Sequence, residues 1–132
     1  MREISHGQCL CGALKYELKG HPSWISHCHC LSCRRNTGCA VVTFVGYPAE
    51  KVTFVQGERA IYNSSLGVWR GFCSKCGTPI SYEADRYPGE IHLYISALDN
   101  PDDFAPQQHV HFNEKIEWFD TNDDLPRKES SG

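Results

Sequence analysis

The chain has 132 residues, of which 40% are hydrophobic and 22% are charged. This is the length of one domain, with enough apolar material to exclude a wholly disordered chain. The formal net charge of −3 gives no basic field for nucleic acid or an acidic membrane surface. No apolar run approaches the ~18 residues of a membrane span, and no apolar secretory segment follows the first residues. We therefore expect a single-domain cytoplasmic protein without nucleic-acid or membrane partners.

Short runs of β-branched and aromatic residues recur between turn signals, and helical periodicity is nearly absent, which is typical of a mainly β protein. Residues 13–18 and 51–56 alternate apolar and polar side chains, whereas 40–45 is a continuous apolar run closed by Gly46-Tyr47-Pro48. We expect further strands at 59–63, 68–72, 80–83 and 90–97, a loop or short helical turn at 99–103, and closing edge strands at 110–112 and 116–119. The domain should span 1–126, followed by a disordered tail over 127–132.

Cysteines dominate the chemistry of this sequence. Seven of the eight form three tight groups, at positions 9 and 11, at 28, 30 and 33, and at 73 and 76. In a reducing compartment, such clusters indicate metal or redox chemistry rather than structural disulfides. A dithiol redox role for Cys73 and Cys76 lacks the βαβ context that such motifs normally have.

Two of these groups together predict a closed zinc site. Cys73 and Cys76 have the spacing of a metal knuckle, and Gly77 directly after them suits a left-handed backbone. Cys9 and Cys11 are two residues apart, so on an extended strand both thiols face the same way. Four thiolates from the two groups make a structural zinc site that ties the first strand to the middle of the chain.

The middle group predicts a second zinc site with an open position. Cys28, Cys30 and Cys33 bring three thiolates to one ion, and three protein ligands plus a vacancy is the arrangement of a catalytic zinc. Three thiolates and one Zn²⁺ carry a formal charge of about −1, yet a fourth, soft sulfur can still bind there as a thiolate. We therefore expect two zinc ions per chain.

Three residues near the middle group are alternatives for a fourth ligand. Strand alternation sends the side chains of His27 and His29 to the face opposite the thiols, which disfavours both as ligands. Cys39 can complete a closed site, but the role of a small buried apolar residue is favoured for it.

Other residue types point to a substrate. Arg34 and Arg35 directly follow the middle group and can hold substrate carboxylates as bidentate forks. Their alternative role is that of solvated surface residues or structural salt-bridge partners. Trp24, Trp69 and Trp118 can line a pocket, although large aromatic side chains at strand positions more often belong to the core.

The order and spacing of these motifs resemble the glutathione-dependent formaldehyde-activating enzyme family. The matching stretches are Gly7-Gln8-Cys9-Leu10-Cys11-Gly12, Cys28-His29-Cys30-Leu31-Ser32-Cys33-Arg34-Arg35-Asn36-Thr37-Gly38 and Phe72-Cys73-Ser74-Lys75-Cys76-Gly77-Thr78-Pro79. The later stretch Leu98-Asp99-Asn100-Pro101, with Pro106 and His109, is also similar to that family. The resemblance covers nearly the whole chain.

This resemblance implies an antiparallel β-tent with zinc knuckles, a structural zinc on Cys9, Cys11, Cys73 and Cys76, and a catalytic zinc on Cys28, Cys30 and Cys33. It also implies the joining of formaldehyde to glutathione as S-hydroxymethylglutathione, formally the reverse of a carbon–sulfur lyase reaction. Two alternatives stay open: a non-catalytic zinc protein that binds or carries a thiol, and a structural adaptor, since a centromere-associated protein has a similar domain. The sequence by itself leaves the general base and the oligomeric state open.

Overall fold

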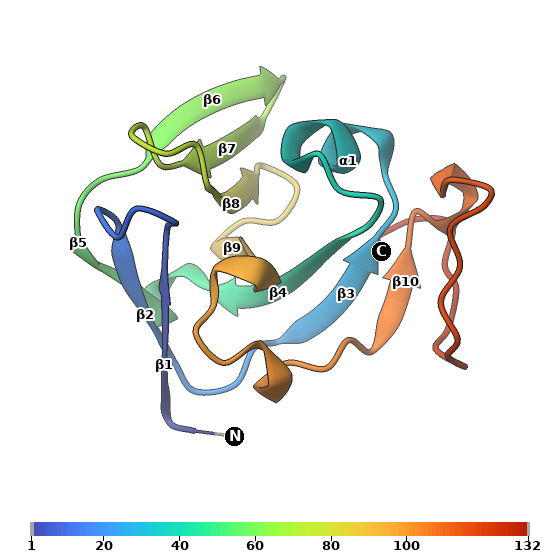
Figure 1. The fold of residues 1–132 in the computed structure, drawn as a ribbon, viewed down its shortest axis with the longest axis horizontal. Helices are drawn as coiled ribbons and strands as arrows, with labels where there is room; N and C mark the ends of the chain where they lie inside the picture. Colours follow the sequence, from blue (N-terminus) through green and yellow to red (C-terminus); the bar gives the residue numbers. More distant parts are fainter. Residues whose placement is uncertain (1, 132) are drawn as a thin grey trace.

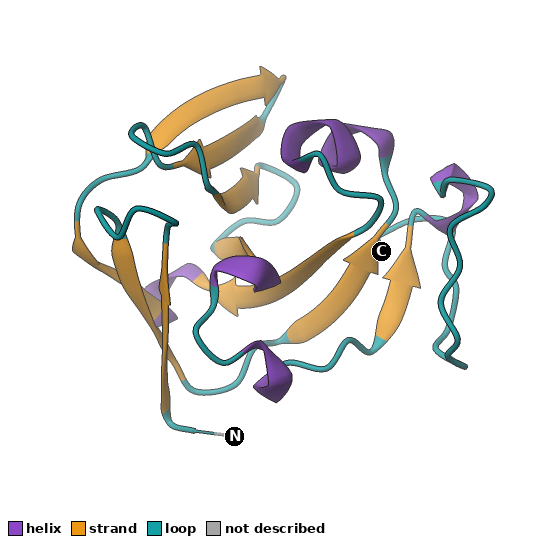
Figure 2. Ribbon diagram, in the orientation of Figure 1, coloured by secondary structure: helices purple, strands orange, loops and turns teal. Residues whose placement is uncertain are grey.

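Two β-sheets and a few short helices make up the structure, a computed structural model that describes residues 2–131 (Figures 1 and 2). The smaller sheet has the strand order β1 (Ile4–Gln8), β2 (Lys15–Lys19) and β5 (Val52–Gln56). The larger sheet has the order β10 (Gln108–Val110), β3 (Trp24–Cys28), β4 (Val42–Pro48), β9 (Glu90–Tyr94), β8 (Pro79–Ala84), β7 (Val68–Phe72) and β6 (Ala60–Ser65). The helices are α1 (Leu31–Thr37) and the 3₁₀ turns η1 (Ala49–Lys51), η2 (Ile95–Ala97), η3 (Pro101–Asp103) and η4 (Phe112–Glu114).

The predicted mainly β fold class is confirmed. Strand pairs are antiparallel except for β10 and β3, which run side by side in the same direction in Figure 1. Because α1 is the longest helix of residues 2–131 and has seven residues, no helix in this part of the chain is long and apolar enough to cross a membrane.

Two strands and the α-helix were not revealed by the sequence patterns; they are β1, β3 and α1. In β1 the inward positions are the small residues Ser5 and Gly7, because the Tyr16 ring of β2 packs directly over Gly7, where a Cβ would overlap it. In β3 the polar Ser26 is buried, so an apolar alternation is missing. Helix α1 is only two turns long, and Cys33 is its one buried residue.

Two expected edge strands near the carboxyl end differ from the observed structure. The strand expected at 110–112 lies earlier, as β10, and η4 follows it directly. The strand expected at 116–119 is wrong, since these residues form a turn in which Phe119 N–H donates to the Ile116 carbonyl at 3.0 Å. Arg127 forms a bridge beside His109, and the Lys128 carbonyl accepts from Phe112 N–H at 2.9 Å.

The continuous apolar character of β4 arises because both faces of the larger sheet are covered. Val45 and Tyr47 of β4, with Ile91 and Leu93 of β9, face the main core, which also contains Tyr16 and Leu18 of the smaller sheet. The alternate residues Phe44 and Tyr94 belong to a second cluster on the other face. A strand buried on both sides carries apolar residues at successive positions.

Strand β4 also continues through the residues expected to close it. Gly46 lies opposite both Trp24 of β3 and His92 of β9, and the Trp24 indole occupies the space where a side chain at 46 would stand. Tyr47 is fully buried and its hydroxyl donates to the Gly20 carbonyl at 2.8 Å. Gly46 is thus a packing position within the strand rather than a turn residue.

This packing gives a testable prediction. The substitution Gly46→Ala should lower the free energy of unfolding by about 1–3 kcal/mol, because the new methyl group overlaps the Trp24 indole. In a Trp24→Ala background, the same substitution should cost less than half as much. Urea unfolding of the four proteins in this cycle measures both costs, and equal costs in the two backgrounds would contradict the assigned contact.

Candidate metal centres

The first cysteine cluster joins the two sheets. Cys9 and Cys11 follow β1, and Cys73 and Cys76 lie in the turn between β7 and β8. Sulfur–sulfur distances are 3.6 Å for Cys9–Cys11 and 3.8 Å for Cys11–Cys73, and all four sulfur atoms lie within 4.8 Å of one another. A tetrahedral ion with ~2.3 Å metal–sulfur bonds places its sulfur ligands about 3.8 Å apart. The donor set therefore fits a metal ion such as zinc.

The turn that carries Cys73 and Cys76 has the form expected for a knuckle. Gly77 adopts a φ of +81° and its N–H donates to the Cys73 carbonyl at 2.8 Å, so the left-handed conformation predicted at this glycine is confirmed. Thr78 Oγ1 lies 3.1 Å from Cys76 Sγ and accepts from Leu10 N–H at 2.9 Å. The hydrogen bonds from the Thr78 side chain and backbone lower the pKa of Cys76 to about 5, which favours the thiolate.

The other half of the cluster differs from the expected geometry. Cys9 and Cys11 do not lie on an extended strand but in a turn, in which Gly12 N–H donates to the Cys9 carbonyl at 3.1 Å. The positive φ of Gly12, +79°, completes this turn. Leu14 N–H then points at Cys9 Sγ at 3.3 Å. The two thiols converge because the chain turns back, not because side chains alternate along a strand.

The second cluster forms where β3 ends and α1 begins. Cys28 is the last residue of β3, Cys30 is the N-cap of α1, and Cys33 is the buried residue of that helix. The Cys28 and Cys33 sulfur atoms are 3.8 Å apart, and Cys33 N–H donates to Cys30 Sγ at 3.4 Å. All three sulfur atoms lie within 4.8 Å of one another. No histidine, aspartate, glutamate or fourth cysteine of residues 2–131 joins this group.

The three thiols of the second cluster influence one another strongly. Hydrogen bonds with Cys30 and Cys33, together with burial, raise the pKa of Cys28. The hydrogen bonds from Cys28 and Cys33 lower the pKa of Cys30 instead. One thiol therefore ionises readily while its neighbour holds its proton, until a cation supplies compensating charge. This donor set also fits a soft metal ion.

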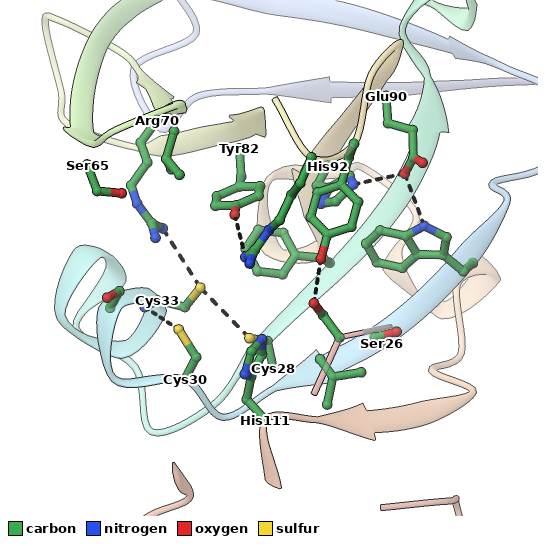
Figure 3. Close-up of a pocket in the computed structure, with 18 of the residues that line it drawn as sticks. Ser26, Cys28, Cys30, Cys33, Ser65, Arg70, Tyr82, Glu90, His92 and His111 are labelled. Atoms are coloured by element: carbon green, nitrogen blue, oxygen red, sulfur yellow. Dashed lines mark hydrogen bonds and ion pairs between the residues drawn. The ribbon is translucent and has the colours of Figure 1, made fainter. Parts of the chain in front are cut away.

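A cavity of about 340 Å³ opens beside the second cluster (Figure 3). Its walls come from the second face of the larger sheet, from α1 and from the segment after β10. Charged and aromatic side chains line it together with the three thiols; they are Trp24, Phe44, Arg70, Tyr82, Arg86, Tyr87, Glu90, His92 and His111. The volume suits a small organic molecule.

Strand register assembles one wall of this cavity. Arg70 of β7 lies opposite Tyr82 of β8, which lies opposite His92 of β9, so the three share one face of the sheet. The Arg70 guanidinium is 5.1 Å from the centre of the Tyr82 ring, and the Tyr82 and His92 rings stack with centroids 5.4 Å apart. Glu90 Oε1 accepts from His92 Nε2 at 3.0 Å and from Trp24 Nε1 at 3.4 Å (Figure 3). The wall is therefore tightly packed.

Arg70 is the cavity residue in direct contact with the thiols. Its Nη1 lies 3.8 Å from Cys33 Sγ, as the dashed line in Figure 3 shows, and its Nε donates to Ser64 Oγ at 3.1 Å. Burial lowers the pKa of the guanidinium, while Cys33 and Tyr94 beside it together raise that pKa, so it ends above its ordinary value. The one sequence signal for Arg70 is a cation in the middle of the apolar strand 68–72.

His111 is a further cavity residue that the sequence patterns did not reveal. It is the non-glycine residue with positive φ in the described chain, at +51°, a conformation that costs a non-glycine residue free energy. Its Nδ1 lies 3.4 Å from Glu114 Oε2. Glu114 Oε1 also accepts from Leu31 N–H, at the first turn of α1, at 3.2 Å. The strained backbone and the carboxylate together hold the imidazole at the cavity.

The arginines predicted to bind substrate lie outside the lining of this cavity. Arg34 Nε donates to the His29 carbonyl at 3.1 Å and its Nη2 donates to the Glu114 carbonyl at 2.8 Å, so this side chain ties α1 to η4. Arg35 is exposed on α1. The cavity instead takes its arginines from β7 and from the turn after β8, as Arg70 and Arg86. A substrate role for Arg34 and Arg35 stays a prediction.

The other candidates for a fourth ligand also lie apart from the thiols. His27 Nδ1 bonds to Thr43 Oγ1 at 2.7 Å, and His29 Nε2 bonds to His109 Nδ1 at 2.8 Å. Cys39 is exposed beyond the end of α1, so its expected role as a small buried residue is wrong. Of the three tryptophans, Trp24 lines the cavity, whereas Trp118 and Trp69 are 78% and 37% exposed.

Together, these features define a mainly β protein with two cysteine clusters that can hold metal ions, one of them at a cavity. A family model described as "Glutathione-dependent formaldehyde-activating enzyme" matches residues 4–114, and the chain belongs to this family. A curated relative from Halomonas elongata, named "Putative glutathione-dependent formaldehyde-activating enzyme", is 27% identical over 128 residues, covering 89% of this chain and 80% of that protein.

A solved structure shows the same fold. The crystal structure of a Rhodobacter sphaeroides protein matches this chain with a TM-score of 0.62 at 20% identity, covering 92% of this chain and 98% of that one. At this identity the likeness concerns the arrangement of strands and helices alone.

The first cluster allows a direct test. We expect Cys76→Ser to lose one metal ion and to be unfolded or molten, because structural zinc contributes about 10–16 kcal/mol while a whole domain is stable by only about 5–15 kcal/mol. Metal analysis and thermal unfolding followed by circular dichroism measure both effects. Cys39→Ser, which changes an exposed cysteine outside both clusters, is the control. A Cys76→Ser protein with unchanged thermal stability would refute the assignment.

Proposed function

We propose that the protein joins formaldehyde to a small thiol, with glutathione as the thiol and S-hydroxymethylglutathione as the product. The S–H bond adds across the C=O bond, so that a carbon–sulfur bond and an O–H bond form; in reverse this is a carbon–sulfur lyase reaction. The observation that carries the proposal is the set of three thiols converging on the wall of a cavity, with no fourth ligand from residues 2–131. Membership of the family supports the same reaction.

Two zinc ions per chain belong to this proposal. Cys9, Cys11, Cys73 and Cys76 would hold a structural zinc, and Cys28, Cys30 and Cys33 would hold the second ion at the cavity. When bound there, zinc stabilises a sulfur ligand as the thiolate at neutral pH. Three protein ligands would leave one position for a sulfur that enters from the cavity.

The residues of the cavity supply the other requirements of the reaction. The packed wall of Trp24, Tyr82 and His92 limits the space beside the thiols, so that the thiol and the aldehyde are held together. His111 supplies a proton-transfer group: with Nδ1 held by Glu114, its other ring nitrogen takes the proton that the thiol loses and returns it to the oxygen of the adduct. No other co-reactant is needed for this balance.

The main test combines metal content with turnover. We expect two zinc ions in the purified protein and in Cys39→Ser, but one in Cys30→Ser. Formation of S-hydroxymethylglutathione, followed by exchange NMR, should exceed the spontaneous rate in the first two proteins and match it in the third. Thiol binding without acceleration would contradict catalysis and favour a carrier, and acceleration that persists in Cys30→Ser would contradict the site.

A second test concerns the proton-transfer group. We expect His111→Gln to lower kcat by about 10²-fold while KM for glutathione changes little, because general acid–base groups act on the chemical step. The matched variant Glu114→Gln, which removes the charge beside Nδ1, should have a smaller effect of the same kind. Loss of glutathione affinity with an unchanged kcat would instead place His111 among the binding groups.

A further inference from the structure

Arg70 is a buried cation that pairs with no carboxylate of residues 2–131. The residue is 5% exposed, and its described partners are Ser64, Cys33, Tyr94 and the Tyr82 ring. By contrast, Arg59, on the other face of the same sheet, pairs with Glu83 at 2.9 Å. A buried guanidinium is stable only when an anion or several acceptors offset its lost hydration.

The second arginine of the cavity does not share this constraint. Arg86 is exposed and donates through Nη2 to the Tyr82 hydroxyl at 3.2 Å, so water stabilises its charge. Of the two cavity arginines, only Arg70 therefore depends on an anion inside the cavity. Arg70 Nη1 lies 3.8 Å from Cys33 Sγ, and the residue lines the cavity wall. The anion that stabilises its charge is therefore expected at the sulfur cluster.

Charge at the cluster explains why one cation is placed there. Three thiolates and one Zn²⁺ carry a formal charge of about −1, and a guest thiolate makes it about −2. A second negative charge in a partly buried site is unfavourable unless a cation lies within a few ångströms. Arg70 reaches the cluster from β7, on the side of the cavity, and thus faces both Cys33 and the space that a guest occupies.

We propose that the Arg70 guanidinium is the counter-cation of a guest thiolate bound beside Cys33, so that the cavity selects the sulfur of its ligand rather than a carboxylate. This inference rests on the proposed function, since it takes the guest to be a thiol. Arg70 acts here as a positioning residue: it contacts a cluster sulfur and stabilises the anionic form of the ligand. The ligand class is then any small thiol, with or without a carboxylate.

Calorimetric titration of the zinc-loaded protein with two probes tests this inference. The probes are 2-mercaptoethanol, which has no carboxylate, and 3-mercaptopropionate, which has one. We expect Arg70→Gln to weaken the binding of both thiols by the same factor, about tenfold or more, with zinc content unchanged. Arg70→Lys should retain most of the affinity because it keeps the charge. Arg59→Gln, an equal change of charge on the opposite face of the sheet, should bind both thiols like the wild type.

Three results would overturn the inference: equal affinity in Arg70→Gln and the wild type, a loss confined to 3-mercaptopropionate, or an equal loss in Arg59→Gln. If Arg70→Gln does not fold, Arg70→Met, which keeps the packing of the stem over Tyr82, gives the same comparison. The failure of the proposed function is a separate result: a wild type that binds both thiols without accelerating the reaction contradicts catalysis, while the comparison of the Arg70 variants still decides the role of the guanidinium.

Discussion

The contact between two turns that lie far apart in the sequence is the constraint on which the rest of the structure depends. The turn after β1 carries Cys9 and Cys11, and the turn between β7 and β8 carries Cys73 and Cys76. Their sulfur atoms meet, so the smaller sheet is held against one face of the larger sheet. The main core lies between the two sheets, and the opposite face of the larger sheet is left to form the cavity.

One face of the larger sheet packs in the main core and the other lines the cavity. Side chains alternate between the two faces along each strand. In β9, Ile91 and Leu93 belong to the core, while His92, which lies between them in the sequence, lines the cavity on the other face of the sheet. In β4, Val45 faces the core and Gly46 leaves room for the Trp24 indole on the other side. Stability and binding thus share the same strands but use alternate residues, so a change on the cavity face need not disturb the main core.

Structural features that depend only on residues close together in the sequence were well predicted. The strands at 51–56, 68–72 and 80–83 follow from alternation and β propensity, because each strand has at least one largely apolar face. The thiol groups follow from short spacings, and the left-handed Gly77 follows from its place after a knuckle. Strand β3 was missed because its polar or small residues Ser26 and Cys28 line the cavity, while Ile25 on its other face lies in the main core, so that no apolar alternation appears.

The sequence by itself determined which cysteines converge within each short group, since a turn or a short helix holds each group together, whereas the meeting of Cys11 with Cys73 is a contact of the tertiary structure. Only the tertiary structure decided which cations face the second group. Arg34 and Arg35 follow Cys33 on α1, but successive residues of a helix point about 100° apart, so neither shares the direction of that sulfur. Arg70 reaches the same sulfur from β7, some 37 positions later in the chain, because strand pairing places it there. Such a contact depends on register across several strands, which no local pattern of residues specifies.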